Sequence, residues 1–325
     1  MARADLVLNL VETGIKGDLP RFKITAEAIA AEATARHQYQ LADKLKNILT
    51  SSGSGSGETR RYTYDNDLQN AFYEIQPRKI IDDLIVSESV VTQFMELIEE
   101  HARRDVLRSY NLEPRHKLLL SGPPGNGKTS IAEALANHLS LPFFTVKYEG
   151  IINRYLGETA QQIDKLFEFV KTQRCVLFFD EFDAIGKERE DANDNGEMKR
   201  VVNSLLKQID LLPSHVVVVG ATNHESMLDK AIWRRFQLQI TVPAPTQRMA
   251  MKWFEEFEKR VGHSLGLAPS TLARKLSGLS FAELEEFALD VQRKYVLGLP
   301  ASKNKLKDIS AHCLKYWTDR YRQEN

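Results

Sequence analysis

A glycine-rich stretch at residues 121–130 carries the residue types that bind phosphate groups. It reads S-G-P-P-G-N-G-K-T-S, follows three leucines typical of a buried strand, and precedes an alanine-rich helical pattern. Its glycines let backbone N–H groups approach phosphate oxygens, and a helix that begins near Lys128 points the positive end of its dipole at them. In this context the motif predicts a P-loop, in which Lys128 reaches the terminal phosphates of a nucleotide and Thr129 binds Mg²⁺. The predicted nucleotide-binding residues here are Gly122, Pro123, Pro124, Gly125, Asn126, Gly127, Lys128, Thr129 and Ser130.

Two acids follow a second apolar stretch. Residues 175–179 form a continuous apolar run, typical of a parallel strand covered on both faces, and Asp180 and Glu181 come directly after it. Ligands bind at the carboxyl ends of such strands, so we expect both acids to lie where Lys128 lies. Asp180 is then a second ligand of Mg²⁺, and the Glu181 carboxylate can polarise an attacking water molecule.

Two further kinds of polar group complete the predicted site. Residues 215–223 form another apolar strand that ends in Asn223, whose amide can orient water beside a terminal phosphate. Arg234 and Arg235 come next, and paired guanidinium groups can neutralise the charge that develops during phosphoryl transfer. An isolated Asn more often forms a turn, and paired arginines are usually only solvated. Both assignments therefore depend on the two stronger motifs.

Strands and helices must alternate to position these groups. Strands are predicted at 118–120, 142–147, 175–179, 215–223 and 238–242. Helices are predicted at 131–136, 159–172 and 198–211, and a long one at 87–108 with Ser87 as its cap. Residues 62–86 show no clear periodicity. The alternation predicts an α/β fold of the P-loop NTPase kind, an open sheet between two layers of helices, at residues 62–243.

Three regions flank this sheet domain. Residues 1–50 carry three short amphipathic segments and predict a small helical bundle, either a docking module for a substrate or partner or a solubilising cap. Docking is favoured because a flexible Gly/Ser-rich linker, natural or engineered, follows at 51–61. Residues 244–325 are helical by period and predict a smaller lid domain, in which Ser280 and Glu283 form a capping box.

Composition excludes several classes of protein. The 325 residues are 42% hydrophobic and 27% charged, with a formal net charge of zero, so neither nucleic acid nor an acidic membrane surface is an expected partner. No apolar run approaches the roughly 18 residues that a membrane span needs. Two cysteines, Cys175 and Cys313, suggest neither a disulfide framework nor a zinc site, so we expect a cytoplasmic protein.

The order of these motifs resembles that of AAA ATPases of the classical clade, which includes katanin, spastin and FtsH. Residues 122–129 resemble Walker A, 178–185 Walker B, 220–223 sensor 1, and 228–236 the second region of homology. The resemblance implies ATP hydrolysis with Mg²⁺. It also implies that Arg234 and Arg235 act on ATP bound by a neighbouring subunit, and hence a homo-oligomer, which in this family is a hexameric ring.

Other assignments rest on the resemblance alone. Residues 153–158 match the first pore loop, where Tyr155 and Leu156 would grip a polypeptide in the central channel. A tyrosine packed on its own domain is the alternative. The acidic loop 187–197 falls at the second pore loop, and Ile85 lies in the segment that holds adenine in the family.

The lid and the N-terminal region narrow the resemblance. Residues 280–283 read S-F-A-E, without the arginine that many AAA+ proteins place there as sensor 2. The classical clade also lacks it, which disfavours clamp loaders and replication initiators. Residues 1–50 weakly resemble the small helical docking modules of several ring ATPases, including bacterial ones.

The implied function is ATP-driven remodelling, unfolding or translocation of protein substrates. The alternative is a nucleotide-gated scaffold whose ATP state controls partner binding without threading. The sequence contains no H-E-x-x-H motif, so degradation would need a separately encoded protease, which the resemblance allows without requiring. A motor acting on DNA is disfavoured by the charge.

Overall fold

The computed structural model describes residues 25–26, 28–29, 71–147, 156–183, 196–225, 228, 230–298 and 306–324. The chain falls into two compact units, Met1–Thr63 and Tyr64–Asn325. In the first unit Thr25, Ala26 and Ile29 are helical and buried. The rest of the predicted bundle and the Gly/Ser-rich linker lie outside the described residues.

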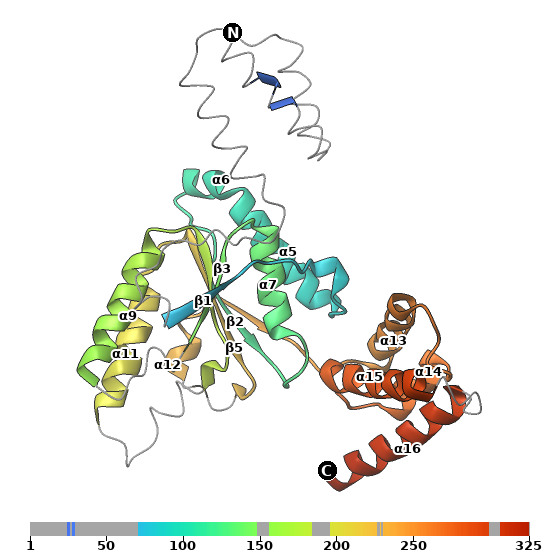
Figure 1. The fold of residues 1–325 in the computed structure, drawn as a ribbon. Coiled ribbons are helices and arrows are strands. Elements are labelled where there is room, and N and C mark those ends of the chain that lie inside the picture. Colours follow the sequence, from blue (N-terminus) through green and yellow to red (C-terminus); the bar gives the residue numbers. More distant parts are fainter. Residues whose placement is uncertain are drawn as a thin grey trace. The chain divides into compact units, whose positions relative to one another are not determined.

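A six-stranded sheet forms the centre of the second unit (Figure 1). Its strands are β1 (Phe72–Ile75), β2 (Lys117–Ser121), β3 (Phe143–Val146), β4 (Cys175–Phe179), β5 (Val216–Thr222) and β6 (Leu238–Thr241). Their order is β1-β3-β4-β5-β2-β6, with β1 antiparallel to β3 and the other pairs parallel. The predicted α/β fold is confirmed. Strand β1 was not predicted, because four residues at a sheet edge are too few to show a period.

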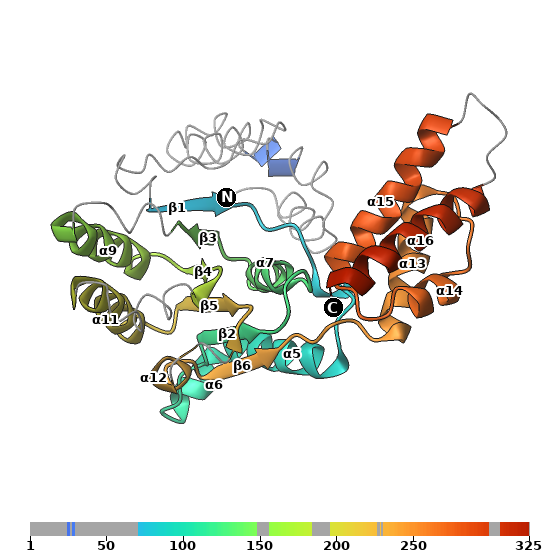
Figure 2. The same cartoon turned by 90° about the horizontal axis from the view of Figure 1, so that it is seen from below.

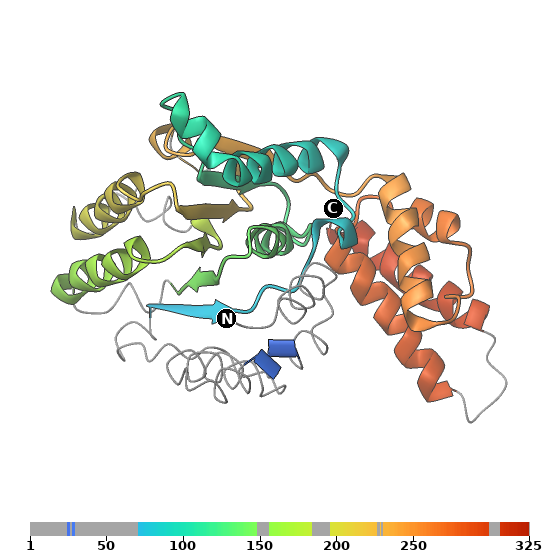
Figure 3. The same ribbon diagram turned by 90° about the horizontal axis from the view of Figure 1, so that it is seen from above.

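Helices cover both faces of the sheet (Figures 2 and 3). They are α5 (Glu88–Ala102), α6 (Arg104–Ser109), α7 (Lys128–His138), α9 (Leu156–Lys171), α11 (Gly196–Asp210) and α12 (Lys230–Trp233). Side chains alternate along each strand, so Leu119 packs into one core with α9 and α11, while Leu118 and Leu120 pack into another with α5 and α7. The central strands are buried on both faces, as their continuous apolar runs predict.

The prediction of one helix over 87–108 is wrong, because the chain forms two helices that meet at Arg103. Its backbone leaves the helical conformation there, at φ −104° and ψ 26°. Helix α5 buries Val90, Phe94 and Leu97, whereas α6 buries nothing, so no packing holds the second segment in line with the first. Ser87 occupies the cap position, but its Oγ lies 3.1 Å from that of Ser89 and makes no hydrogen bond to the α5 backbone.

A separate helical part follows the sheet and has its own core. It consists of α13 (Gln247–Val261), α14 (Pro269–Lys275), α15 (Phe281–Gly298) and α16 (Leu306–Glu324). Phe254, Leu272 and Phe287 are buried between these helices. The predicted capping box is confirmed, since the Ser280 N–H donates to Glu283 Oε2 (2.6 Å) and the Glu283 N–H donates to Ser280 Oγ (3.4 Å). Among the described helices, none has the length and apolar character to cross a membrane.

The Gly122→Ala substitution tests how the loop after β2 is packed. A Cβ at Gly122 would lie 2.1 Å from the carbonyl oxygen of Val242, at a φ of +141°. We therefore expect Ala to lower the free energy of unfolding by about 2–4 kcal/mol. The matched control is Gly262→Ala, where φ is +76° but no atom lies within 4 Å. Only backbone strain of about 1 kcal/mol is expected there. Thermal unfolding measures both, and equal losses would contradict the packing.

Candidate nucleotide-hydrolysis site

The predicted P-loop connects β2 to α7 and forms a cradle around the end of Lys128. Gly127 precedes α7 in the left-handed conformation, at φ +85°. The Lys128 side chain is buried, and its Nζ donates to the carbonyl oxygens of Gly122 (2.6 Å) and Pro123 (2.9 Å). Burial lowers the pKa of Lys128, while the nearby Asp180 and Asp183 carboxylates oppose that effect. The ammonium group is therefore poorly hydrated and can exchange carbonyl for phosphate oxygens.

Thr129 and Asp180 come together at the carboxyl ends of β2 and β4. The Thr129 hydroxyl donates to Asp180 Oδ2 across 3.3 Å, and Asp180 Oδ1 accepts from the Glu181 N–H at 2.9 Å. A hydroxyl and a carboxylate oxygen in this arrangement fit Mg²⁺, which takes few protein ligands and is completed by phosphate and water. Within the described ranges no group of three or more His, Cys, Asp or Glu could hold a metal by itself.

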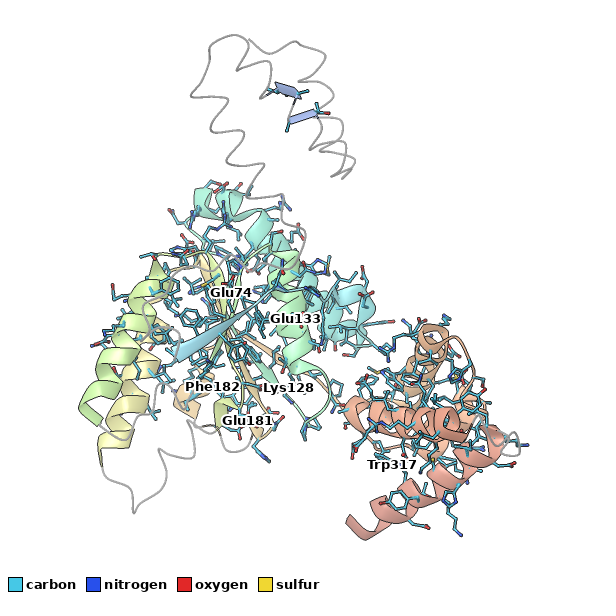
Figure 4. The ribbon with its side chains drawn as sticks, in the orientation of Figure 1. Glu74, Lys128, Glu133, Glu181, Phe182 and Trp317 are labelled. Atoms are coloured by element: carbon cyan, nitrogen blue, oxygen red, sulfur yellow. The ribbon has the colours of Figure 1, made fainter. Side chains whose placement is uncertain are left out.

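Glu181 lies in the left-handed conformation directly before a tightly packed residue. Its φ is +47°, a region that costs a non-glycine residue about 1–2 kcal/mol. The next residue, Phe182, is fully buried, with its ring 5.8 Å from that of Phe179 and 5.3 Å from that of Phe236. This anchor leaves Glu181 exposed at the edge of the sheet where Lys128 lies (Figure 4).

Asp183 is a site residue to which the sequence analysis gave no role. It is 5% exposed, and its Oδ1 accepts from the Thr222 hydroxyl at 3.0 Å and the Asn223 N–H at 3.4 Å. These bonds join the loop after β4 to the end of β5. They hold Asn223 at the carboxyl ends of the parallel strands, where Glu181 also lies. The signal for it in the sequence was weak, a third acid in the D-E-F-D stretch after the strand.

The segment just before Ile85 is hydrogen-bonded to the P-loop helix by side chains that the sequence analysis did not single out. Glu133 accepts from the Arg78 and Lys79 N–H groups, at 3.0 and 3.3 Å. Asn137 Nδ2 donates to the Lys79 carbonyl at 2.8 Å, and Lys79 Nζ donates to Ser130 Oγ at 2.7 Å. Ile85 follows this segment and is half-buried. Residues 78–81 and α7 therefore form one hydrogen-bonded unit, and Ile85 follows it four residues later in the chain.

The P-loop also contacts the start of α15. The Ala282 N–H donates to the Gly125 carbonyl at 3.0 Å, and the Phe281 N–H donates to Asn126 Oδ1 at 3.3 Å. Asn126 is 3% exposed, and its Nδ2 donates to the carbonyls of Pro123 (3.2 Å) and Pro124 (3.3 Å). The lid helix thus meets the P-loop through backbone groups at the place where a sensor 2 arginine is lacking.

Arg234 and Arg235 lie at the amino ends of the parallel strands, whereas the P-loop lies at their carboxyl ends. Both precede β6, which runs parallel to β2 with Leu238 beside Leu118. Arg235 Nε donates to Asp210 Oδ2 at 2.9 Å, at the end of α11, and Arg234 is exposed. A five-residue strand spans about 16 Å, so the structure does not bring these guanidinium groups to the chain's own P-loop.

Two predicted features fall partly or wholly outside the described residues. Tyr155 and most of the acidic loop at 187–197 are among them. Leu156, expected in the pore loop, is the first residue of α9, and its side chain is not described.

These elements define a P-loop nucleoside triphosphatase with a helical lid. Residues 118–244 match the family described as "ATPase family associated with various cellular activities (AAA)". An uncharacterised AAA family ATPase of Sinorhizobium fredii is 36% identical over 290 residues, which cover 88% of this chain and 87% of that protein. The chain belongs to the AAA family and is an ATPase.

Two further similarities agree with this assignment. A cell division cycle protein 48 homologue of Archaeoglobus fulgidus is 30% identical over 276 residues. The match covers 82% of this chain but only 36% of that protein. The crystal structure of the FIGL-1 AAA domain superposes with a TM-score of 0.61 over 80% of this chain and 92% of that domain. At 20% identity, this second similarity supports the fold alone.

Proposed function

We propose that this ATPase assembles into a hexameric ring and uses ATP hydrolysis to remodel protein substrates by pulling a polypeptide through the central channel. The separation of Arg234 and Arg235 from the chain's own P-loop carries the proposal, because they can complete a nucleotide site only in a second copy. A closed ring gives every copy the same two half-sites. The two cysteines are unpaired and buried, which supports a reducing, cytoplasmic setting.

Each residue at the P-loop edge has a chemical task in this proposal. Lys128 binds the terminal phosphates in place of the Gly122 and Pro123 carbonyls. Thr129 and Asp180 hold Mg²⁺, which supplies positive charge against the phosphate oxygens. Glu181 accepts a proton from the attacking water that Asn223 orients.

The Tyr155→Ala substitution separates threading from simple nucleotide-gated binding. If the tyrosine grips the polypeptide, unfolding of a fluorescent protein with an unstructured tail should fall at least about tenfold, while ATP turnover stays near wild type. Tyr316→Ala is the matched control, because that ring lies on α16 and is 60% exposed. Unfolding is measured as the loss of fluorescence after ATP is added.

Two results would contradict threading. Unchanged unfolding by Tyr155→Ala would remove the tyrosine from the mechanism and favour the nucleotide-gated scaffold. An equal loss with Tyr316→Ala would show that the effect is not specific to Tyr155. A separate protease partner stays part of the proposal only if wild-type rings release their substrate unfolded and uncleaved.

A further inference from the structure

A cavity of about 460 Å³ lies at the amino ends of the parallel strands, whereas the P-loop lies at their carboxyl ends. Its lining includes residues that directly precede strands: Arg174 before β4 and His215 before β5. The basic side chains of the lining are His101, Arg104, Arg108, Lys171, Arg174 and His215, against one acid, Asp105. We call this cavity the edge pocket.

Helix ends explain only some of these basic residues. His101, Arg108 and Lys171 occupy the last turns of α5, α6 and α9, where a positive charge is favourable beside the helix carbonyls. Arg104 instead begins α6, where a positive charge is unfavourable, and Arg174 belongs to no helix. These two guanidinium groups need another reason to face the same cavity.

The pairing of charges singles out the same two residues. Arg108 lies 3.2 Å from Glu113, and Lys171 lies 2.8 Å from Glu168. The acid paired with Arg104 is Asp105, at 3.9 Å and with 88% of its side chain exposed. Within the part of the chain that the structure describes, Arg174 makes no hydrogen bond or ion pair.

The charges of Arg104 and Arg174 converge on His101. Burial lowers the pKa of the His101 imidazole, and both guanidinium groups lower it further. The carbonyl of Arg115 lies 2.7 Å from His101 Nε2 and favours the protonated form, as does Glu100. The Arg104 and Arg174 guanidinium groups therefore act on the same imidazole, against the Arg115 carbonyl and the Glu100 carboxylate, so both guanidinium groups lie near His101.

We propose that the edge pocket binds a compact multivalent oxyanion of the pyrophosphate class, held by Arg104 and Arg174. Guanidinium groups match phosphate oxygens with paired hydrogen bonds. The volume falls within the roughly 300–1,000 Å³ of small-molecule sites. Pro114 and Leu141 are the apolar residues among those that line the pocket, and six basic side chains surround them, so the lining favours a small anion over a nucleotide. This inference does not depend on ring formation or threading.

Calorimetric titration of the full chain with inorganic pyrophosphate tests the edge pocket. We expect two separable sites in the wild type. The Arg104→Gln, Arg174→Gln double variant should weaken the edge site at least tenfold and leave the P-loop site and basal ATP turnover intact. Lys128→Met should do the opposite and weaken only the P-loop site. The Arg103→Gln, Arg260→Gln variant removes the same charge from side chains that are 64% and 61% exposed, and should change neither site.

Four results would overturn the proposal. The first is a single site that Lys128→Met abolishes, and the second is an equal loss of binding in the Arg103, Arg260 control. The third is citrate binding as tightly as pyrophosphate, since charge alone would then account for the affinity. The fourth is a double variant that sediments differently from wild type without pyrophosphate, since the arginines would then serve assembly.

Discussion

Replacing Glu181 with Gln should nearly abolish ATP turnover while leaving ATP binding intact. The amide keeps the size of the side chain but cannot accept a proton from water, and losing a general base costs about 10²–10⁴-fold in rate. The fold should tolerate the change, since Glu181 is exposed and the hydrogen bond it makes within the described residues comes from its backbone N–H to Asp180. Phosphate release measures turnover, and titration with a fluorescent nucleotide measures binding.

The matched control for Glu181 is Glu225→Gln. Glu225 is also an exposed acid, two residues after Asn223, so the same chemical change is made near the same edge of the sheet. Its turnover should stay within about twofold of wild type. Turnover of Glu181→Gln at the wild-type rate would show that another group activates the water.

Replacing Arg234 or Arg235 with Ala should lower ATP turnover about 10³-fold, the effect of removing an arginine that neutralises transition-state charge. ATP affinity should change little, because both residues precede β6 and therefore lie at the amino ends of the strands, away from their own P-loop. The same phosphate-release and nucleotide-titration measurements apply. Turnover near wild type in both variants would remove these residues from catalysis.

Arg235 needs a control of its own, because it pairs with Asp210. The ion pair is 2.9 Å long, with 29% and 42% of its two side chains exposed, so its loss should cost less than about 1 kcal/mol. Asp210→Asn weakens the same pair but keeps the arginine. We expect its turnover to stay close to wild type. A fall as large as that of Arg235→Ala would mean that the pair supports the fold and that the arginine has no catalytic role.

The predicted site residues follow from local patterns because the sheet is parallel. Asp180 follows one apolar strand and Asn223 follows another, and both lie with Lys128 at the carboxyl ends of the parallel strands, which the order of the motifs predicted. The groups that hold them in place could not be predicted in this way. Asp183 is significant only through its hydrogen bond to Thr222, and Asn126 only through its contact with α15. Both contacts join segments distant in sequence, and no local period encodes them.

The two errors about secondary structure have a similar cause. Strand β1 is recognisable only by its pairing with β3, from Phe72 beside Val146 to Ile75 beside Phe143. The break at Arg103 depends on α6 having nothing to pack against, which polar residues on an exposed helix cannot reveal. Tertiary contacts decided both cases, since short elements carry too few residues for periodicity to do so.

Mixing two inactive variants tests most directly whether one nucleotide site is shared between two copies. One variant carries Glu181→Gln with both arginines intact, and the other carries Ala at Arg234 and Arg235 with Glu181 intact. If the two variants are mixed in equal amounts and assemble at random into the proposed ring, about a quarter of the seams join an intact Glu181 to an intact arginine pair, so turnover should return to about a quarter of wild type. If fluorescence transfer shows that the subunits have mixed and the mixture stays as inactive as its components, the shared site is contradicted.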